Sequence, residues 1–350
     1  MMAPPLFSTD LDLILRETQS LWEPMRGRRI FFTGGTGFFG CWLLESFCHI
    51  NRELSLEASA TVLTRSPASF SAKAPHLARN PHVQLLAGDV RNFKFPEGEF
   101  PYVIHAATEA SARQAAEAPL EMLSTILAGT QRTLEFAAAH RTARFLLTSS
   151  GAVYGRQPSS ITHLPESYAG APDPLDPSSV YAEGKRAAEL MCSLYQKTAG
   201  IECAIARCWA FCGPHLPLDA HFAIGNFIGN VLGRERISIQ GDGTPRRSYL
   251  YGADLAIWLW TMLFRAPSLT PINVGSDEDV SILDLAQKVA RTLDLDTGID
   301  VAGSPVHGAA PSRYVPSVDR ARQLLGLRQV VSLEESIRRT AAWYRSAALD

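Results

Sequence analysis

The sequence predicts an α/β protein built on a doubly wound parallel sheet, with a smaller C-terminal lobe beside it. Two observations lead to this fold class. Apolar runs with strand character alternate along the chain with helical segments, a pattern typical of parallel sheets that helices cover on both faces. The first of these runs, residues 29–33, leads directly into a glycine-rich turn at residues 33–40 and then into a helix. That succession is typical of Rossmann-like sheets.

The individual elements follow from apolar spacing and from helix-breaking residues. An amphipathic helix is expected first, over residues 8–22, and Pro24 and Gly27 end it. Six strands are expected next, at residues 29–33, 60–64, 83–87, 102–106, 144–149 and 202–206. The longer helices between them are expected at about residues 38–50, 119–139 and 180–199. Shorter helices are expected near residues 221–233, 252–265 and 281–293.

The change to shorter and less regular segments after residue 206 indicates a second lobe. We therefore divide the chain into an N-terminal helical extension (1–27), a dinucleotide-binding domain (28–206) and a mostly C-terminal substrate-binding lobe (207–350). The proline-rich stretch at residues 156–179 is expected to form a long loop. Long loops in α/β enzymes often form a wall of the active site.

Composition excludes several classes of protein. The chain has 350 residues, with 33 Lys and Arg against 35 Asp and Glu, and 46% of it is hydrophobic. This balance gives no electrostatic reason to expect nucleic acid as a partner. No apolar run approaches the roughly 20 residues of a membrane-spanning helix, and the N-terminus lacks the basic start and apolar block of a secretory signal. We expect a cytoplasmic protein with no membrane partner.

The six cysteines are expected to be reduced thiols rather than disulfides or metal ligands. Cys208, Cys212 and His215 lie close together in the sequence, but no fourth ligand is evident. No metal site is predicted.

The glycine-rich turn carries the first binding signal. Its glycines are spaced GxxGxxG between the first strand and the first long helix. Such a turn lets the backbone approach a pyrophosphate, whose charge the N–H groups at the helix N-terminus then meet. Dinucleotide binding is predicted here through Gly34, Thr36, Gly37, Phe38, Phe39 and Gly40.

The end of the second strand indicates which dinucleotide binds. An Asp or Glu there favours NAD, whereas an Arg accommodates the 2′-phosphate of NADP. The chain has Arg65 and no acid in this stretch. NADP is therefore slightly favoured over NAD, although an arginine there can instead stack on adenine. Asp89 and Val90 after the third strand, and Ala106 and Ala107 after the fourth, are the other expected cofactor contacts.

Ser150, Tyr181 and Lys185 form the predicted catalytic set. Tyr181 and Lys185 are four residues apart on an expected helix and thus lie on one face of it. The pKa of a free tyrosine is about 10, and a nearby ammonium and a positive nicotinamide would lower it toward the working range of a base. Ser150 can bond the same substrate oxygen from a strand end. Tyr181 and Lys185 are also expected to contact the cofactor.

With these motifs the chain resembles the extended short-chain dehydrogenase/reductase family, in particular its NAD(P)-dependent nucleotide-sugar epimerase/dehydratase group. The resemblance covers about residues 28–345. The motifs that carry it are GGTGFFG, HAA at 105–107, SSGAVYG, YAEGK, Gly213–Pro214, GDGT before Arg247, and Arg313–Tyr314 before Asp319.

The resemblance implies a reaction and a substrate. The reaction is transient oxidation of a sugar hydroxyl, usually at C4, with Tyr181 as the base, Lys185 as its pKa-setting partner and Ser150 as the donor to the hydroxyl. The implied substrate is a nucleotide-diphosphate sugar, whose diphosphate Arg247 and Arg313 hold. The implied assembly is a homodimer.

One departure from the family pattern bears on the reaction. Similar 4,6-dehydratases carry an Asp-Glu pair just before Val-Tyr-Gly, and similar uronate decarboxylases carry a Glu, where this chain has Gly151 and Ala152. Epimerases and 4-ketoreductases of the family need no acid there, because ring rotation or hydride return completes their cycle, and an epimerase is favoured. A dehydratase or a uronate decarboxylase would need a relocated acid, for which Glu109, Glu166 and His163 are the candidates.

A second departure concerns the substrate. Similar enzymes usually have an Asn at the position of Ala210 that helps to hold the sugar nucleotide, and Asn226 is the candidate replacement. Glu109 is a further candidate for substrate contact. A ketoreductase of a non-nucleotide substrate is therefore an alternative. A non-catalytic redox-sensing regulator is another, against which the intact Ser150, Tyr181 and Lys185 set argues.

Overall fold

The computed structural model describes residues 3–107, 112–220, 222–294 and 298–347. Its centre is a seven-stranded sheet in the order β11-β6-β5-β4-β1-β2-β3, in which every neighbouring pair is parallel. Its strands are β1 (Arg29–Thr33), β2 (Ser59–Thr64), β3 (Val83–Ala87), β4 (Tyr102–His105), β5 (Arg144–Ser150), β6 (Glu202–Cys208) and β11 (Pro271–Val274). The prediction of a Rossmann-like, doubly wound parallel sheet is confirmed.

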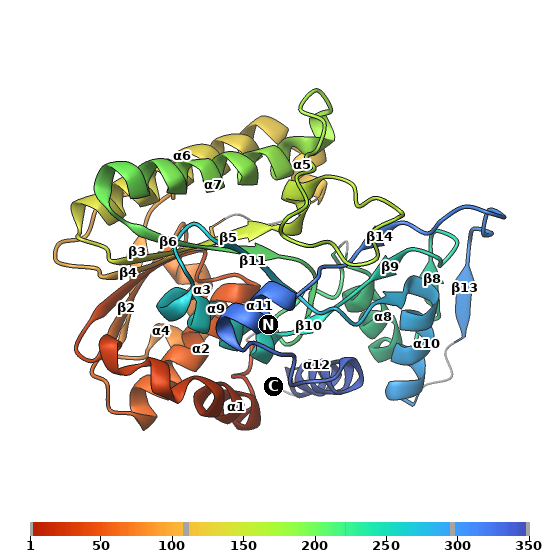
Figure 1. Ribbon diagram of the computed structural model, residues 1–350. Helices are drawn as coiled ribbons and strands as arrows, with labels where there is room; N and C mark the ends of the chain where they lie inside the picture. The colour runs from red at the N-terminus through yellow and green to blue at the C-terminus, as the bar shows by residue number, and fades with distance from the viewer. Residues whose placement is uncertain (1–2, 108–111, 221, 295–297, 348–350) are drawn as a thin grey trace.

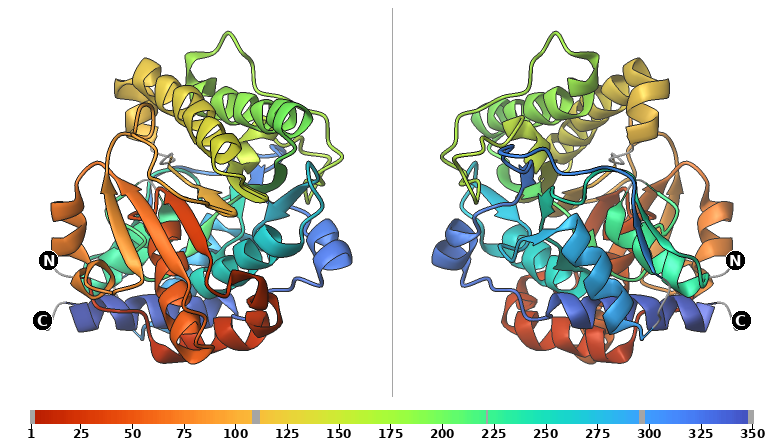
Figure 2. Two further views of the ribbon diagram at one scale, coloured as in Figure 1. Left: turned by 90° about the vertical axis from the view of Figure 1, so that its left-hand side faces the viewer. Right: turned by 90° about the vertical axis from the view of Figure 1, so that its right-hand side faces the viewer.

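Helices cover both faces of this sheet (Figures 1 and 2). One face carries α6 (Pro119–Ala139) and α7 (Val180–Ala199), and the other carries α1 (Ser8–Thr18), α2 (Phe38–Glu53) and α9 (Gly252–Arg265). Adjacent residues of a strand therefore enter different cores: Phe31 packs under α6, whereas Phe32 packs with the helices of the opposite face. This double coverage explains why the strands are almost continuously apolar.

A smaller lobe lies beside the sheet and has a hydrophobic core of its own. Its helices are α8 (Ala223–Leu232), α10 (Ile282–Thr292) and α12 (Leu333–Ala347). Its short strands are β7 (Phe211–Cys212), β8 (Ile237–Ile239), β9 (Arg246–Arg247), β10 (Leu250–Tyr251), β12 (Val280–Ser281), β13 (Ile299–Val301) and β14 (Arg313–Tyr314). The short helices α3 (Pro67–Lys73), α4 (Pro75–Ala78), α5 (Ala112–Glu117) and α11 (Asp319–Leu325) complete the described α-helices.

The sequence locates the six predicted strands and the long helices to within a few residues, but it misses β11, the short helices α3, α4, α5 and α11, the C-terminal helix α12 and the short strands of the smaller lobe. Strand β11 begins at Pro271, which cannot donate a ladder hydrogen bond, and its four residues give a weak strand signal. It is tolerated because it lies at the edge of the sheet and pairs with β6 alone. The first helix ends at Thr18 rather than at residue 22, and 3-10 turns follow it.

Two segments from residues 207–350 return to the main sheet. Strand β11 extends it, and α9 packs against β5 and β6. The division of the chain into residues 1–27, 28–206 and 207–350 stays a prediction. Within the described residues, no helix combines the length and apolar character needed to cross a membrane.

The first helix is fastened to the body by a buried carboxylate. Asp10 accepts a hydrogen bond of 2.8 Å from the Tyr251 hydroxyl and pairs with Arg339 on α12. Trp22, just after the helix, is buried against Trp260 of α9, with 4.6 Å between ring centroids. The N-terminal extension is therefore part of the packed core.

Candidate active site

The glycine-rich turn packs so closely that side chains are excluded from it. Gly34 has φ +72°, and a Cβ on it would lie 2.0 Å from the carbonyl oxygen of Ala106 at the end of β4. A Cβ on Gly40 would lie 2.2 Å from the backbone of Gly35, where α2 meets the strand. The turn therefore needs glycine at both positions, one for a left-handed backbone and one for close helix packing.

The N-terminus of α2 faces this turn with its backbone donors uncapped. Gly37 is the N-cap residue, and no side chain in the described structure caps the helix. The first N–H groups of the helix, beginning at Phe38 and Phe39, have no helical acceptor. Together with the helix dipole they form a site for a phosphate group.

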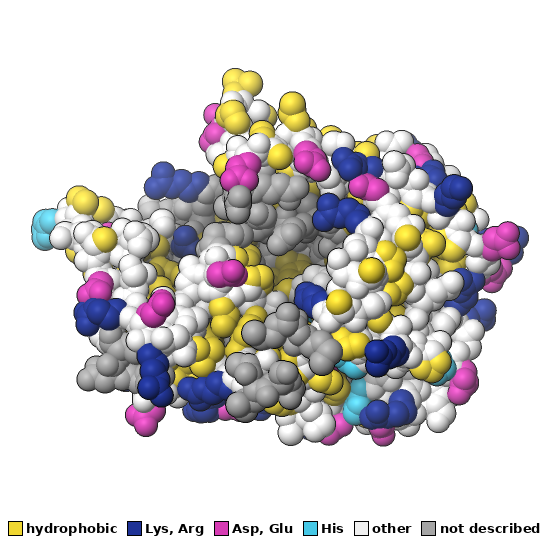
Figure 3. Space-filling view, turned by 180° about the vertical axis from the view of Figure 1, so that it is seen from behind, with side chains coloured by type: hydrophobic (Ala, Val, Ile, Leu, Met, Phe, Trp, Pro, Cys, Tyr) yellow, Lys and Arg dark blue, Asp and Glu magenta, His cyan; other side chains and the backbone are white. Residues whose placement is uncertain are grey.

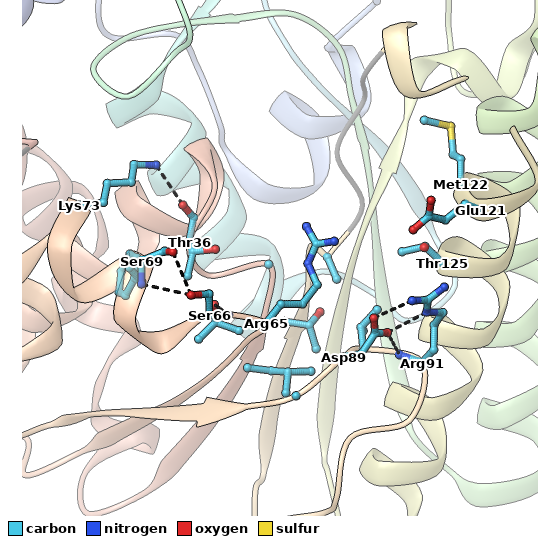
Figure 4. A pocket seen from close by; sticks show the side chains of 18 residues that line it. Thr36, Arg65, Ser66, Ser69, Lys73, Asp89, Arg91, Glu121, Met122 and Thr125 are labelled. Carbon is cyan, nitrogen blue, oxygen red and sulfur yellow. Dashed lines mark hydrogen bonds and ion pairs between the residues drawn. The ribbon is translucent and has the colours of Figure 1, made fainter. Parts of the chain in front are cut away.

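A pocket of about 340 Å³ opens beside the turn (Figure 4). It is lined from β1 and the turn by Thr33, Gly34 and Thr36, and by Arg65 after β2. Of the other predicted cofactor residues, Asp89, Val90 and Ala107 also line it. Figure 4 shows Arg65 extending into the space between α3 and the Asp89 side of the pocket. The structure thus brings the residues predicted for an adenosine group to one cavity.

The charged side chains of this pocket differ in whether they have a partner of opposite charge. Asp89 accepts two hydrogen bonds of 2.8 Å from the Arg91 guanidinium, which hold the pKa of this carboxyl below its ordinary value. Lys73 donates to the carbonyl oxygen of Thr36 at 3.2 Å. Arg65 adds a positive charge near Asp89 that further lowers the pKa of Asp89. The Arg65 side of the pocket is therefore positive, and the Asp89 carboxylate already has a partner.

Ser66, Ser69 and Lys73 also line this pocket and are not among the predicted cofactor residues. Ser66 caps α3 by accepting a hydrogen bond of 3.2 Å from the backbone N–H of Ser69. Lys73 lies one helical turn beyond Ser69. The sequence could have indicated these residues, because a serine before a proline marks a helix start and residues four apart share a helix face.

The predicted catalytic residues converge where β5 and α7 meet. Ser150 is the last residue of β5, in register with Cys208 of β6. Tyr181 and Lys185 follow one another on the first two turns of α7, which packs against β5. The Lys185 ammonium lies 5.8 Å from the centroid of the Tyr181 ring.

Burial dominates the ionisation of this pair. It raises the pKa of Tyr181 to about 12, an effect that hydrogen bonding to the Ser150 side chain partly offsets. It also lowers the pKa of Lys185 to about 8. Lys185 donates a hydrogen bond of 2.8 Å to the carbonyl oxygen of Thr148, so its ammonium is directed at the strand. The role of Lys185 in setting the Tyr181 pKa stays a prediction.

A network of hydrogen bonds between polar side chains connects the strand ends next to the site with the helices that cover them. The Glu189 carboxylate on α7 accepts a hydrogen bond of 2.5 Å from Ser149 and bonds of 3.0 and 2.7 Å from Arg207. His105 at the end of β4 bridges the hydroxyls of Thr33 and Thr130 at 2.7 and 3.0 Å. These contacts hold the ends of β1, β4, β5 and β6 in a fixed relation to α6 and α7.

Gly151, the residue after Ser150, has two aromatic neighbours. A Cβ at this position would lie 2.7 Å from the Trp209 indole and 2.8 Å from the Tyr314 hydroxyl. The Trp209 and Tyr314 rings pack on each other with 4.4 Å between centroids. The structure therefore leaves no room for a carboxylic side chain at residue 151.

The predicted diphosphate arginines lie on adjacent strands. Strand β9 pairs with β14, which places Arg247 opposite Tyr314 and Arg246 opposite Arg313. Asp279 pairs with both Arg246 and Arg313, the latter at 2.8 Å. The Arg247 guanidinium donates to the carbonyl oxygen of Arg246 at 2.8 Å. One carboxylate against three guanidinium groups leaves this cluster positive.

Two of the three candidates for a relocated acid are hydrogen-bonded to the backbone of the fold. Glu166 accepts a hydrogen bond of 2.9 Å from the backbone N–H of Asn273, so it is held in the fold. His163 is bonded at 3.0 Å to the carbonyl oxygen of Asp277. Glu109 lies outside the described residues. Asn226 lies on α8, with a partly buried side chain.

The three residues of the CxxxCxxH run, Cys208, Cys212 and His215, each contact a different part of the fold. Cys212 contacts Thr340, His215 contacts Glu45 at 3.1 Å, and Cys208 lies near the carbonyl oxygen of Ala206. Among the residues that the structure describes, no group of three or more His, Cys, Asp or Glu side chains is placed to hold a metal ion.

Seen from behind, the surface is hollowed between the two halves of the molecule, and Lys and Arg side chains lie around the hollow (Figure 3).

Comparison with known proteins agrees with this geometry. The sequence profile of the NAD dependent epimerase/dehydratase family matches residues 30–275. UDP-glucuronic acid decarboxylase 1 of Arabidopsis thaliana is 30% identical over 92% of this chain and 71% of its own. A crystal structure of UDP-galactose 4-epimerase is 25% identical and superposes with a TM-score of 0.72 over 91% of this chain and 99% of that one. A dTDP-glucose 4,6-dehydratase from Streptomyces venezuelae with NAD bound shares the fold, with a TM-score of 0.74 at 22% identity over 91% of this chain and 97% of its own.

Proposed function

Since the chain belongs to the NAD dependent epimerase/dehydratase family of extended short-chain dehydrogenase/reductase enzymes, we propose that it acts on a nucleotide-diphosphate sugar as a 4-epimerase. Ser150, Tyr181 and Lys185 form its catalytic set. The pocket beside Arg65 holds the adenosine end of a nicotinamide cofactor, and the arginine cluster on β9 and β14 holds the substrate diphosphate.

The residues present fit such a cofactor. Glycine at residues 34 and 40 lets the turn pack against the backbone of Ala106 and lets α2 pack against Gly35, and the uncapped start of α2 offers donors for a pyrophosphate. The pocket lined by Arg65 and Asp89 accommodates an adenosine group. When bound, the oxidised nicotinamide supplies the hydride acceptor and a positive charge that favours the Tyr181 phenolate.

The chain's own groups then handle the proton. The Tyr181 phenolate accepts the proton of the C4 hydroxyl, and Ser150 donates a hydrogen bond to the same oxygen. Lys185, whose ammonium lies near the Tyr181 ring, stabilises the phenolate once a ligand draws it away from Thr148. In the return half of the cycle, Tyr181 gives the proton back to the C4 oxygen of a sugar that has rotated.

The packing around Gly151 is the observation that favours an epimerase over a dehydratase. Elimination of water needs an acid near the leaving hydroxyl, and the space beside Ser150 is taken by Trp209 and Tyr314. Glu166 is bound to the backbone of Asn273. Hydride return to the opposite face requires no further acid or base, so the described groups suffice for epimerisation.

A uronate decarboxylase is the second candidate, because the curated relatives include several UDP-glucuronic acid decarboxylases. A carboxylate on C5 is β to a C4 ketone, so carbon dioxide can leave with its bonding electrons held in the C4 enolate, and C5 must then take up a proton from a relocated acid. This route needs the same oxidation of the C4 hydroxyl by the nicotinamide with Tyr181 as the base, and it differs in the substituent on the sugar and in the proton that C5 must receive.

The test is a product analysis. Purified enzyme with NAD or NADP is incubated with UDP, dTDP, CDP and GDP sugars, including uronates, and products are analysed by mass spectrometry and NMR. We expect an unchanged mass with inverted C4. Loss of carbon dioxide from a uronate would establish the decarboxylase, and loss of water would establish a dehydratase. Absence of any product, with no ligand-induced rise in thermal midpoint, would exclude nucleotide sugars as substrates.

NADP is the cofactor we propose, on the strength of Arg65 and the hydroxyls of Ser66 and Ser69 around it. We expect Arg65→Ala to weaken NADP binding about 30-fold and NAD binding less than about threefold, since a charge-assisted bond to phosphate contributes roughly 2 kcal/mol. Calorimetric titration measures both affinities. Arg79→Ala, which removes an exposed arginine outside the pocket, is the matched control. Equal losses for both cofactors would mean that Arg65 stacks on adenine instead.

A second copy of the chain is the partner we infer for the face formed by α6 and α7. Leucines of these helices are exposed: Leu120 of α6 at 81%, and Leu190 and Leu194 of α7 at 61% and 52%. Such a patch on paired long helices favours burial against an identical surface.

A further inference from the structure

A second phenol, Tyr314, faces the same serine as Tyr181. It lies on β14, beside Arg247 of β9. Hydrogen bonding to the Ser150 side chain acts on the pKa of both phenols. A negative charge on Tyr181 also raises the pKa of Tyr314. The family resemblance assigns no role to a tyrosine at this position.

The Tyr314 side chain has a fixed place. Its ring packs on Trp209, and its hydroxyl lies 2.8 Å from where a Cβ of Gly151 would be. The segment that follows it, residues 315–317, is bonded to both backbone groups of Leu164 in the long loop. The Leu164 N–H donates to the carbonyl oxygen of Val315 at 2.9 Å, and the Leu164 carbonyl oxygen accepts from the N–H of Ser317 at 2.9 Å. The hydroxyl is thus held beside Ser150 from two directions.

The hydrogen-bonding capacity of Ser150 assigns directions to these contacts. A hydroxyl has one proton to donate and accepts two bonds. Ser150 Oγ already accepts the backbone N–H of Ala152 at 3.1 Å. Burial raises the pKa of Tyr314 above its ordinary value, so this phenol keeps its proton at neutral pH. If Tyr314 donates to the remaining acceptor site, the Ser150 proton is left for Tyr181 and the substrate oxygen.

We propose that Tyr314 is a positioning residue, whose hydroxyl donates to Ser150 Oγ and so directs the Ser150 proton toward Tyr181. The proposal rests on the proposed function, because it needs Tyr181 as the base. No covalent bond forms or breaks at Tyr314. The phenol also takes the space beside Gly151 where similar enzymes carry a carboxylate.

Several charged or titratable groups face the two phenols besides Ser150. They are Lys185 from α7, Cys208 from β6 and Arg247 from β9, while Glu189 of α7 acts on Lys185. Burial raises the pKa of Cys208 to about 12, so this thiol stays neutral. Lys185 and Arg247 both favour an anionic phenol nearby. Tyr181 and Tyr314 therefore compete for one stabilised negative charge, and the Ser150 proton decides that Tyr181 carries it.

The variant Tyr314→Phe tests this, since it keeps the ring on Trp209 and removes only the hydroxyl. We expect kcat to fall about 30-fold with KM for the nucleotide sugar within about twofold, in line with the loss of one hydrogen bond to a charged network. The Tyr181 pKa should rise, because Ser150 no longer holds its proton toward the phenolate. The acid limb of the kcat profile should therefore move to higher pH by about one unit.

Two further measurements make the result decisive. Tyr314→Phe should have no additional effect on kcat in a Ser150→Ala background, because it acts through that serine. Tyr168→Phe removes another phenol from the same aromatic cluster, away from Ser150, and should leave kcat and its pH profile unchanged. Full additivity with Ser150→Ala, or an acid limb that stays or moves to lower pH, would overturn the proposal.

The outcome can be separated from failure of the proposed function. Tyrosinate absorbance is titrated in the protein saturated with NAD or NADP, with no sugar present. The lowest tyrosine transition should rise in Tyr314→Phe and not in Tyr168→Phe. If wild-type enzyme converts no nucleotide sugar, the proposed function fails, yet this titration still supports or refutes the link from Tyr314 through Ser150 to Tyr181.

Discussion

Replacement of Tyr181 by Phe should reduce turnover at least about a thousandfold, because the variant has no group to take the C4 hydroxyl proton. Ser150 cannot replace it, since the pKa of a serine hydroxyl is too high for it to act as a base. Steady-state and single-turnover assays with the nucleotide sugar found by product analysis measure the loss. Reduction of the bound nicotinamide on mixing, followed by its absorbance, should vanish to the same extent.

The fold should survive this change, because the ring of Tyr181 keeps its contacts with the core under α6. We expect the free energy of unfolding to change by less than about 1 kcal/mol and cofactor affinity to change little. Tyr195→Phe removes a partly buried phenol four turns along the same helix and is the matched control. Turnover by Tyr181→Phe within tenfold of wild type would refute the assignment of the base.

The second large effect is expected at Gly34. An alanine there has φ +72° and places its Cβ 2.0 Å from the backbone carbonyl oxygen of Ala106. The backbone conformation alone costs about 1 kcal/mol or more. Relief of the clash must also move the turn or the end of β4. We expect Gly34→Ala to destabilise the protein by about 3 kcal/mol and to weaken dinucleotide binding at least about 100-fold.

Gly326→Ala separates the two causes. Gly326 also has a left-handed backbone, with φ +68°, but nothing lies within 4 Å of the Cβ that a substitution would add. This variant should lose only about 1 kcal/mol and should bind the dinucleotide like wild type. Chemical denaturation and calorimetric titration compare the pair. Equal stability losses, with cofactor binding retained in Gly34→Ala, would show that the turn does not hold the pyrophosphate.

The sequence predicts the parts of this site that depend on local spacing. The glycine turn after β1 and the four-residue interval between Tyr181 and Lys185 are both local, and their elements form where the pattern places them. Lys73 could also have been found, because it continues the helical face that begins at Ser66 and Ser69. Such features follow from helical and strand periodicity alone.

The parts that depend on contacts between distant segments are not predictable in this way. Nothing in the sequence near Gly151 indicates that Trp209 and Tyr314 fill the space beside it. Likewise, the predicted arginine Arg313 gives no hint that Asp279 pairs with it and with Arg246. These pairings arise only when short strands of the smaller lobe come together, and each strand has just two residues of ladder.

The late position of β11 in the chain has a consequence for how the protein is made. During synthesis β6 leaves the ribosome well before residues 271–274, which complete the sheet beside it. Until then β6 is an open edge, and the apolar surface of β5 and β6 lacks the cover of α9. Such an edge invites pairing with other chains. Completion of the main sheet therefore depends on α9 and β11, which are synthesised late. The nascent chain is vulnerable to aggregation until these segments have emerged.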